Sequence, residues 1–138
     1  MKDYMTTCHA VYKLEYHLVV VTKFRHPTLV GPVRDELLEI TRRIFEESWH
    51  LTIRAVNTDI DHIHILFSAP PTVQLSKLVD NYKNVSSRLL RKHHAVFLSN
   101  YYWKAIFWSD SYFIGAVSDV TDEAVKIYIE SQGTKKRR

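Results

Sequence analysis

Hydrophobic and polar positions follow two different periods along this chain, and the changes between them divide it into elements. The nearly continuous apolar run at 16–23 (YHLVVVTK) is rich in β-branched residues and predicts a buried strand. Apolar and polar residues alternate over 51–56, and a second apolar stretch covers 62–68. The turn-forming segment NTDID separates these two stretches, which therefore predict a β-hairpin.

Three other segments have apolar residues spaced by three and four positions, which predicts amphipathic helices. The first covers about 33–49 and follows Pro32, a residue that suits the first turn of a helix. The second begins near 73, and the third covers about 122–132. Thr121 and the two acidic residues after it are typical of a helix N-terminus, where a hydroxyl caps the first turn and the dipole favours negative charge.

The remaining aromatic segment, 101–117, predicts an extended stretch with a bend near 108–110. The order of elements is then β-α-β-β-α-β-α. This order predicts an α+β fold: a ferredoxin-like (split β-α-β) antiparallel sheet with helices on one face, plus a C-terminal helix. A length of 138 residues predicts one domain, 1–138, with a flexible basic tail at about 133–138.

Composition says more about the cellular environment and the class of partner than about the function. The formal net charge is +4 and the sequence pI is about 9.2, a mild basic bias that permits a polyanionic partner. Cys8 is the one cysteine, so no intramolecular disulfide can form, which favours a cytoplasmic setting. No apolar stretch reaches the length of a membrane span, and the first ten residues lack the apolar core of a signal peptide. We therefore expect no membrane partner.

His62 and His64 occupy alternate positions in the otherwise apolar stretch DHIHILFSAPP. Residues two apart in a strand share a face, with Cβ atoms roughly 6.6–7 Å apart, so two imidazoles can converge on one metal ion. Ile63, Ile65 and Phe67 then face the core. By itself the pair is a short pattern that a histidine-rich chain also produces by chance, and it is too small to fill a closed zinc site.

Tyr128 and Gln132 lie one turn apart on the last helix, in the segment YIESQ, and therefore face the same way. A phenol can act as a nucleophile, and an amide oxygen is a ligand for hard cations. The plainer interpretation is an amphipathic helix whose tyrosine packs and whose glutamine is solvated.

Basic residues provide candidates for binding a nucleic-acid backbone. Lys83, Arg88, Arg91 and Lys92 lie away from the apolar stripe of the second helix, and the loop after the first strand adds Lys23, Arg25 and His26. The alternative for such residues is a solvated helix face.

Several motifs together resemble one known family. DHIHILFSAPP resembles the His-hydrophobic-His motif of HUH nucleases. YHLVVVTKFRHP, SKLVDNYKNVSSRLLRK, FWSDSYFIGAVSDVT and AVKIYIESQ are similar, in order and spacing, to segments of the single-tyrosine HUH transposases of small bacterial insertion sequences, the insertion sequence 200/605 family. The likeness extends over about 16–132. The chain departs from the family at Ile60, where proline is usual, at Ser131, where asparagine is frequent, and at His26, where arginine is common.

The resemblance implies a role for each candidate residue. His62, His64 and Gln132 would bind one divalent metal ion, Mg²⁺ or Mn²⁺. Tyr128 would attack a DNA phosphate, form a 5′-phosphotyrosine link and free a 3′-OH. The substrate would be single-stranded DNA with a hairpin near each end of the element. The enzyme would act as a homodimer in the cytoplasm of a bacterium or archaeon, associated with the nucleoid, and the tyrosine helix could complete the partner's site.

Three other interpretations use parts of the same pattern. A domesticated relative would cut chromosomal repeat hairpins with the same chemistry, and a decayed transposase would bind DNA without cutting. A non-catalytic single-stranded nucleic-acid binding module would use the same sheet topology. Such a module has no need for two paired histidines together with a tyrosine and a glutamine, and the chain lacks an RNP-like aromatic strand.

Overall fold

The computed structural model describes residues 5–6, 11–12 and 14–133. The main elements are, in chain order, β3 (Glu15–Val21), α1 (Gly31–Arg42), β4 (Thr52–Thr58), β5 (His62–Ser68), α2 (Leu75–His93), β6 (Phe113–Ala116) and α4 (Asp122–Ser131). Shorter elements are the paired strands β1 (Met5–Thr6) and β2 (Val11–Tyr12), the 3-10 turn η1 (Lys23–Arg25), the π-helical turn η2 (Arg43–Ser48) and α3 (Ala95–Leu98).

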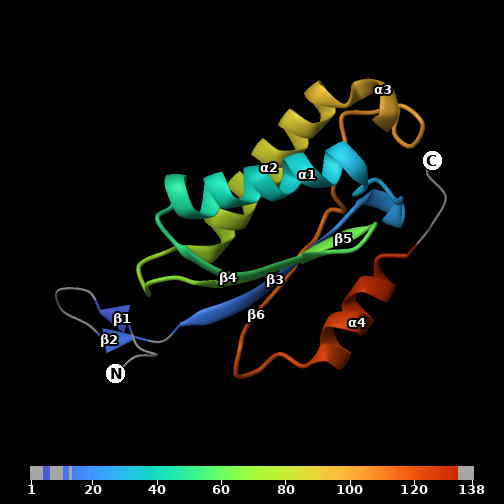
Figure 1. Ribbon diagram of the computed structural model, residues 1–138. Helices are drawn as coiled ribbons and strands as arrows, with labels where there is room; N and C mark the ends of the chain where they lie inside the picture. The colour runs from blue at the N-terminus through green and yellow to red at the C-terminus, as the bar shows by residue number, and fades with distance from the viewer. Residues whose placement is uncertain (1–4, 7–10, 13, 134–138) are drawn as a thin grey trace.

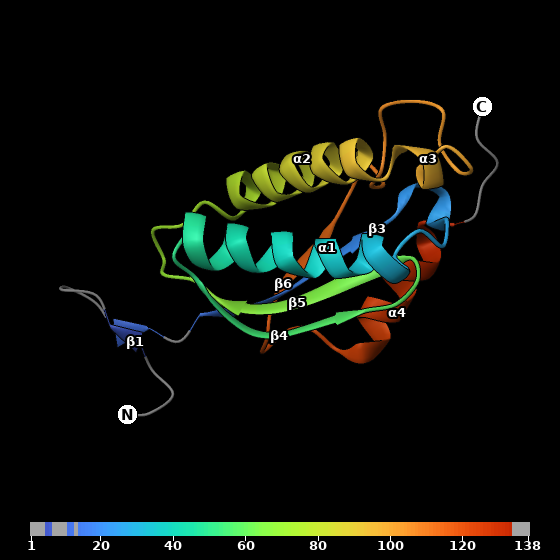
Figure 2. The same cartoon turned by 45° about the horizontal axis from the view of Figure 1, so that its top comes forward.

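The main sheet has the strand order β4-β5-β3-β6, and every neighbouring pair is antiparallel. β5 lies between β3 and β4, the two strands that α1 connects, which is the split β-α-β arrangement. Helices α1 and α2 cover one face of the sheet, while α4 lies against the other face (Figures 1 and 2). The predicted ferredoxin-like α+β fold, with a separate C-terminal helix, is confirmed.

Alternation along β3 and β5 separates the two faces. Leu18, Ile63, Ile65 and Phe67 are fully buried beneath α1 and α2. Val19, one position along from Leu18, points the other way into a small second cluster with side chains of α4. The sheet is therefore covered on both sides, by a large core on one face and by a single short helix on the other.

The core beneath the two long helices is built around aromatic rings. Phe45 packs edge-on against Phe67 and Tyr82, with ring centroids 5.1 and 5.4 Å apart. The buried Tyr82 hydroxyl forms a hydrogen bond of 2.7 Å with the Thr41 hydroxyl, and burial raises the pKa of Tyr82. This bond joins α2 to α1 and satisfies two polar groups that burial would otherwise penalise.

The boundaries differ from the sequence expectation in ways that have local causes. The first helix begins at Gly31, which has a φ of 52°, and it ends in a π-helical turn. The hairpin strand β4 contains a register shift between Ile53 and Ala55, so its inward and outward positions do not alternate strictly. The aromatic segment contributes only four residues to the sheet, together with one isolated bridge between Thr22 and Trp108.

Two expectations concern residues that the structure does not describe. Cys8 and residues 134–138 of the predicted basic tail lie outside the described ranges. Across the described residues, no helix combines the length and apolar character that crossing a membrane requires.

Truncating Phe67 tests the core. We expect Phe67→Ala to lower the free energy of unfolding by about 3–5 kcal/mol, because it leaves a cavity between Phe45 and the sheet. Urea denaturation followed by circular dichroism measures the change. Ile127→Ala, at a side chain 57% exposed on α4, should change stability by less than about 0.5 kcal/mol. Equal losses in the two variants would contradict this description of the core.

Candidate active site

The two histidines of β5 lie on the face of the sheet that α4 covers. In the antiparallel register His62 is opposite Val21, and His64 is opposite Val19. Directly opposed residues point to the same face, and both valines pack against α4 side chains. Both imidazoles are partly buried, while the intervening Ile63 is fully buried on the other side. The two rings therefore project toward the C-terminal helix and away from the main core.

A buried carboxylate orients the first histidine. Asp61 Oδ1 accepts a hydrogen bond of 2.9 Å from His62 Nδ1, and Asp61 Oδ2 accepts one of 3.1 Å from Arg25 Nε. Because an ionised carboxylate can only accept, the proton of neutral His62 lies on Nδ1 and the lone pair lies on Nε2. An imidazole held in this way has the tautomer that metal-binding histidines commonly use.

A third histidine, His17 on β3, adjoins the second. His17 Nδ1 and His64 Nε2 are 2.7 Å apart and share a hydrogen bond. Burial, and then the charges of His17 and His62, lower the pKa of His64, while Asp122 at the start of α4 acts in the opposite direction. His64 is therefore neutral near pH 7. The candidates from sequence did not include His17, although its period-two spacing from Val19 places it on this face.

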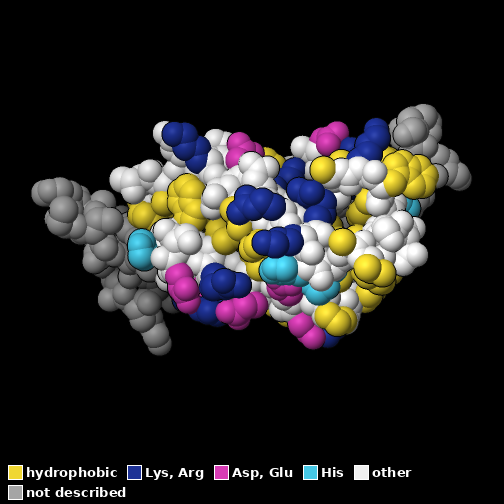
Figure 3. Space-filling model, turned by 90° about the horizontal axis from the view of Figure 1, so that it is seen from above, with side chains coloured by type: hydrophobic (Ala, Val, Ile, Leu, Met, Phe, Trp, Pro, Cys, Tyr) yellow, Lys and Arg dark blue, Asp and Glu magenta, His cyan; other side chains and the backbone are white. Residues whose placement is uncertain are grey.

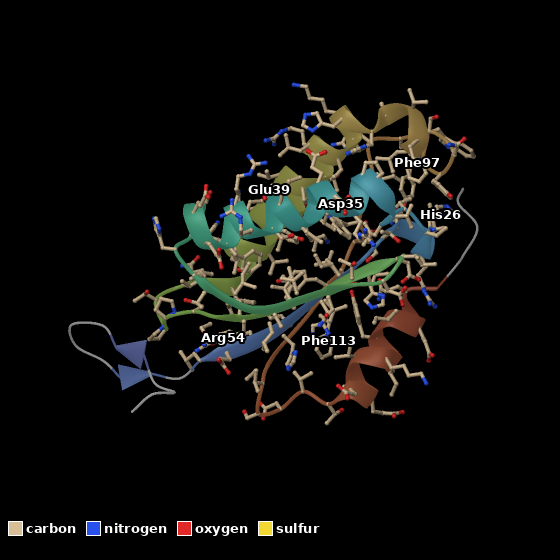
Figure 4. The ribbon with its side chains drawn as sticks, viewed as in Figure 1. His26, Asp35, Glu39, Arg54, Phe97 and Phe113 are labelled. Carbon is tan, nitrogen blue, oxygen red and sulfur yellow. The ribbon has the colours of Figure 1, made fainter. Side chains whose placement is uncertain are left out.

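Helix α4 brings a tyrosine to the same face. Thr121 caps the helix by accepting a hydrogen bond of 3.1 Å from the Ala124 amide, as the sequence predicts. Val125 and Tyr128 then pack on the valines of β3. The Tyr128 ring also lies 5.6 Å from that of Phe113, which projects from β6 toward α4 (Figure 4).

One serine joins the tyrosine to the glutamine. Ser111 Oγ lies 2.8 Å from Tyr128 Oη and donates a hydrogen bond of 3.2 Å to Gln132 Oε1. Burial raises the pKa of Tyr128, and the hydrogen bond with Ser111 partly offsets that rise. The phenol is therefore protonated at neutral pH, and sequence reasoning alone did not single out Ser111.

The basic candidates of the first loop, and Lys83 in the middle of α2, are engaged within the protein. Arg25 binds Asp61, and Lys23 Nζ lies 3.1 Å from the exposed carboxylate of Asp110. His26 packs against aromatic rings, including that of Tyr101 at 5.4 Å. Lys83 Nζ donates hydrogen bonds to the carbonyl oxygens of residues 109 and 111. Lys83 thus supports the loop that carries Ser111.

The basic residues later in α2 are more accessible. Arg88 and Lys92 are exposed, and Arg91 is partly buried, with its Nε donating to the Ser87 hydroxyl at 3.1 Å. Lys and Arg side chains gather near the middle of the surface that α1 and α2 form (Figure 3). This surface lies on the opposite side of the sheet from His62 and His64.

Comparison with known proteins identifies the family. Residues 10–132 match the family described as "Transposase IS200 like". The chain belongs to the IS200-like transposase family. It is 37% identical to the ISDra2 transposase TnpA of Deinococcus radiodurans, over 91% of this chain and 88% of that protein. It is 28% identical to the transposase for insertion sequence element IS200 of Salmonella typhimurium, over 96% of this chain and 85% of that protein.

Solved structures agree with this assignment. A crystal structure of a transposase from Deinococcus radiodurans superposes with a TM-score of 0.85 and 31% identity, covering 95% of this chain and 99% of that one. A REP-associated tyrosine transposase bound to a REP hairpin shares the fold, with a TM-score of 0.55 and 15% identity over 91% of this chain and 69% of that one. The resemblance to insertion sequence 200/605 transposases is confirmed.

The three side chains that the family resemblance implies as metal ligands carry uncharged donor atoms. Among the described residues, no group of three His, Cys, Asp or Glu side chains is placed to hold a metal ion. His62 has its lone pair on Nε2, whereas His64 Nε2 shares a hydrogen bond with His17 and Gln132 Oε1 accepts one from Ser111. Once released from these partners, two imidazoles and an amide oxygen would suit a borderline ion such as Mn²⁺.

The lowered pKa of His64 gives a direct test of this electrostatic environment. We expect its imidazole to titrate below 6.5 in two-dimensional NMR of the Cε1–H groups, with assignment by His64→Asn. Because unfolded His64 binds its proton more tightly, its contribution to stability is fully present above pH 6.5 and is lost as pH falls through the lowered pKa. A midpoint at or above 6.5 would show that burial does not disfavour the charged ring.

Proposed function

We propose that this transposase cleaves and rejoins single-stranded DNA at the ends of an insertion sequence, with Tyr128 as the nucleophile. The phenol oxygen would form a bond to phosphorus while the bond from phosphorus to the 3′ oxygen breaks. The phenol releases its proton to water, and the departing 3′ oxygen takes one up. The product is a 5′-phosphotyrosine link and a free 3′-OH, which can reverse the reaction on another end. The observation that carries the proposal is the common face shared by Tyr128 and the β5 histidines.

His62, His64 and Gln132 would hold a divalent ion, Mg²⁺ or Mn²⁺, that polarises the scissile phosphate. Asp61 supports this role because it holds the His62 ring with its Nε2 lone pair available. The three donors bring no negative charge, so we expect weak binding of the ion by the free protein and tighter binding once a DNA phosphate is present. The residues of this chain thus orient the reactants, while the phosphate completes the set of ligands.

DNA binding would use the accessible basic residues of α2 first. Arg88, Arg91 and Lys92 form no ion pair with any described residue and can contact phosphates directly, whereas Arg25 would have to leave Asp61. A hairpin substrate is supported by the REP-associated tyrosine transposase, which shares the fold and is bound to a REP hairpin. We propose that this surface binds the folded part of the DNA strand and that the α4 face receives the strand to be cut.

We further propose that the protein acts as a homodimer in which α4 can serve either subunit. In this structure Tyr128 packs against the sheet of its own chain. The contact is small, since one buried residue of α4, Val125, and two partly buried neighbours form it. A helix attached by so few side chains can exchange between subunits at low free-energy cost.

A domesticated hairpin nuclease would use the same residues. The insertion-sequence assignment is favoured because the ISDra2 transposase is 37% identical, whereas the REP-associated enzyme is 15% identical. A binding module without catalysis has no need for the hydrogen bonds that join Tyr128, Ser111 and Gln132.

The cleavage test uses labelled single-stranded DNA from the regions that flank the gene. With Mg²⁺ or Mn²⁺, the wild-type protein should form a covalent protein–DNA band on a denaturing gel. Tyr128→Phe should abolish the band because no nucleophile remains, and His64→Ala or chelation of the metal should reduce it at least about 100-fold.

Tyr112→Phe provides a matched control, since Tyr112 lies next to Ser111 and removing its hydroxyl should leave the band intact. DNA affinity, measured by fluorescence anisotropy, should be similar in all variants. Binding without any covalent band, on strands that contain the hairpins, would indicate a binding module or a decayed enzyme instead.

A further inference from the structure

The loop between α3 and β6 carries Ser109 and Ser111 near its end and is anchored to both β3 and α2. The Ser109 amide donates to the Val21 carbonyl at 2.8 Å, which prolongs the pairing with β3. The Trp108 indole donates to Ser86 Oγ on α2 at 2.9 Å. Lys83 adds its two hydrogen bonds to the backbone carbonyls of Ser109 and Ser111. The loop therefore holds both serines at defined positions, with the Ser111 side chain in contact with Tyr128 and Gln132.

The hydrogen-bond direction at Ser111 follows from counting protons. A serine hydroxyl has one proton, and the amide oxygen of Gln132 can only accept. Since Ser111 donates to Gln132 Oε1, its oxygen must accept the proton of the Tyr128 phenol, 2.8 Å away. In the resting protein the chain of donors thus runs from Tyr128 to Ser111 to Gln132. This arrangement orients the phenol oxygen before any DNA is bound.

Ser109 has an unused hydroxyl at the same place. The side chain is buried, with 7% of its surface exposed, and its oxygen has no hydrogen-bond partner among the described residues. Ser109 lies two residues before Ser111, the serine that contacts the phenol, on the same anchored loop. A buried donor without an acceptor costs about 1–3 kcal/mol, so this unpaired hydroxyl calls for a functional explanation.

We propose that Ser111 and Ser109 form a two-hydroxyl cradle for the Tyr128 oxygen. Ser111 orients the phenol in the resting state. When the oxygen carries negative charge, as the attacking atom in cleavage or the leaving atom in rejoining, both hydroxyls donate to it. Ser111 then turns its proton away from Gln132 Oε1, which frees that oxygen to bind a cation. This inference rests on the proposed nucleophilic role of Tyr128.

The kinetic test compares Ser111→Ala, Ser111→Thr and Ser109→Ala under single-turnover conditions. One assay measures formation of the covalent adduct, and a second measures release of isolated adduct by a strand with a 3′-OH. Ser111→Ala should slow both steps by about 10- to 100-fold, because one donor to the charged oxygen is lost. Ser109→Ala should slow them less, while Ser111→Thr, which keeps the hydroxyl, should retain most of the wild-type rate.

Ser118→Ala is the matched control, since Ser118 is an exposed serine beyond β6 that contacts only the neighbouring Asp119 among the described residues. It should react at the wild-type rate. DNA affinity and thermal stability should be unchanged in Ser111→Ala, because Ser111 is exposed and lies outside the core. Wild-type rates in Ser111→Ala, or equal losses in the alanine and threonine variants, would overturn the cradle.

A second measurement separates failure of the cradle from failure of the proposed function. Tyrosine labelled with carbon-13 at Cζ reports ionisation of Tyr128 by NMR without DNA or metal, with assignment by Tyr128→Phe. Removing the Ser111 hydroxyl should raise the pKa of Tyr128, because the phenolate loses a donor whose charge-assisted bond is stronger than the bond that the neutral phenol makes to Ser111. An unchanged titration in Ser111→Ala would exclude the cradle even if the enzyme cleaves DNA. A raised pKa with no adduct in any variant would leave the cradle intact and reject the nucleophile.

Discussion

The register between β3 and β5 is the constraint on which the rest of the site depends. Because side chains alternate at every position, a shift of one residue would turn His62 and His64 into the core and expose Ile63 and Ile65. The large core beneath α1 and α2 opposes that shift, since it requires the isoleucines to remain buried. The stability of one face of the sheet therefore determines which groups the other face presents.

The second face of the sheet is covered much less extensively, which suits its proposed role of admitting a DNA strand. A single short helix covers it, and only a few apolar side chains of α4 hold that helix in place. The loop with Ser109 and Ser111, by contrast, is tied to β3 and α2 by hydrogen bonds. The site thus combines histidines on the face of the sheet, a loop anchored by hydrogen bonds, and a weakly attached helix that carries Tyr128. Such a design would allow Tyr128, the proposed nucleophile, to move while the histidines and the loop stay in place.

The sequence predicts the elements whose patterns are set locally. The strand 62–68 and the Thr121 cap occur as predicted, because alternation and capping depend on neighbouring residues. His17 could be placed beside His64 only once the strand register was known. The serine contacts depend on how the aromatic segment meets α4, a tertiary arrangement that no local pattern encodes. The same reason applies to Lys83, whose charge suggests DNA but whose amine binds the loop.

The most direct test of the central claim is to locate the DNA on the protein. The covalent adduct would be digested with trypsin and nuclease and analysed by tandem mass spectrometry. The chain has eight tyrosines, and the expected tryptic peptide 127–135 (IYIESQGTK) contains only Tyr128. Our account predicts a nucleotide joined to that peptide through its tyrosine. A nucleotide on a peptide from any other part of the chain would contradict it.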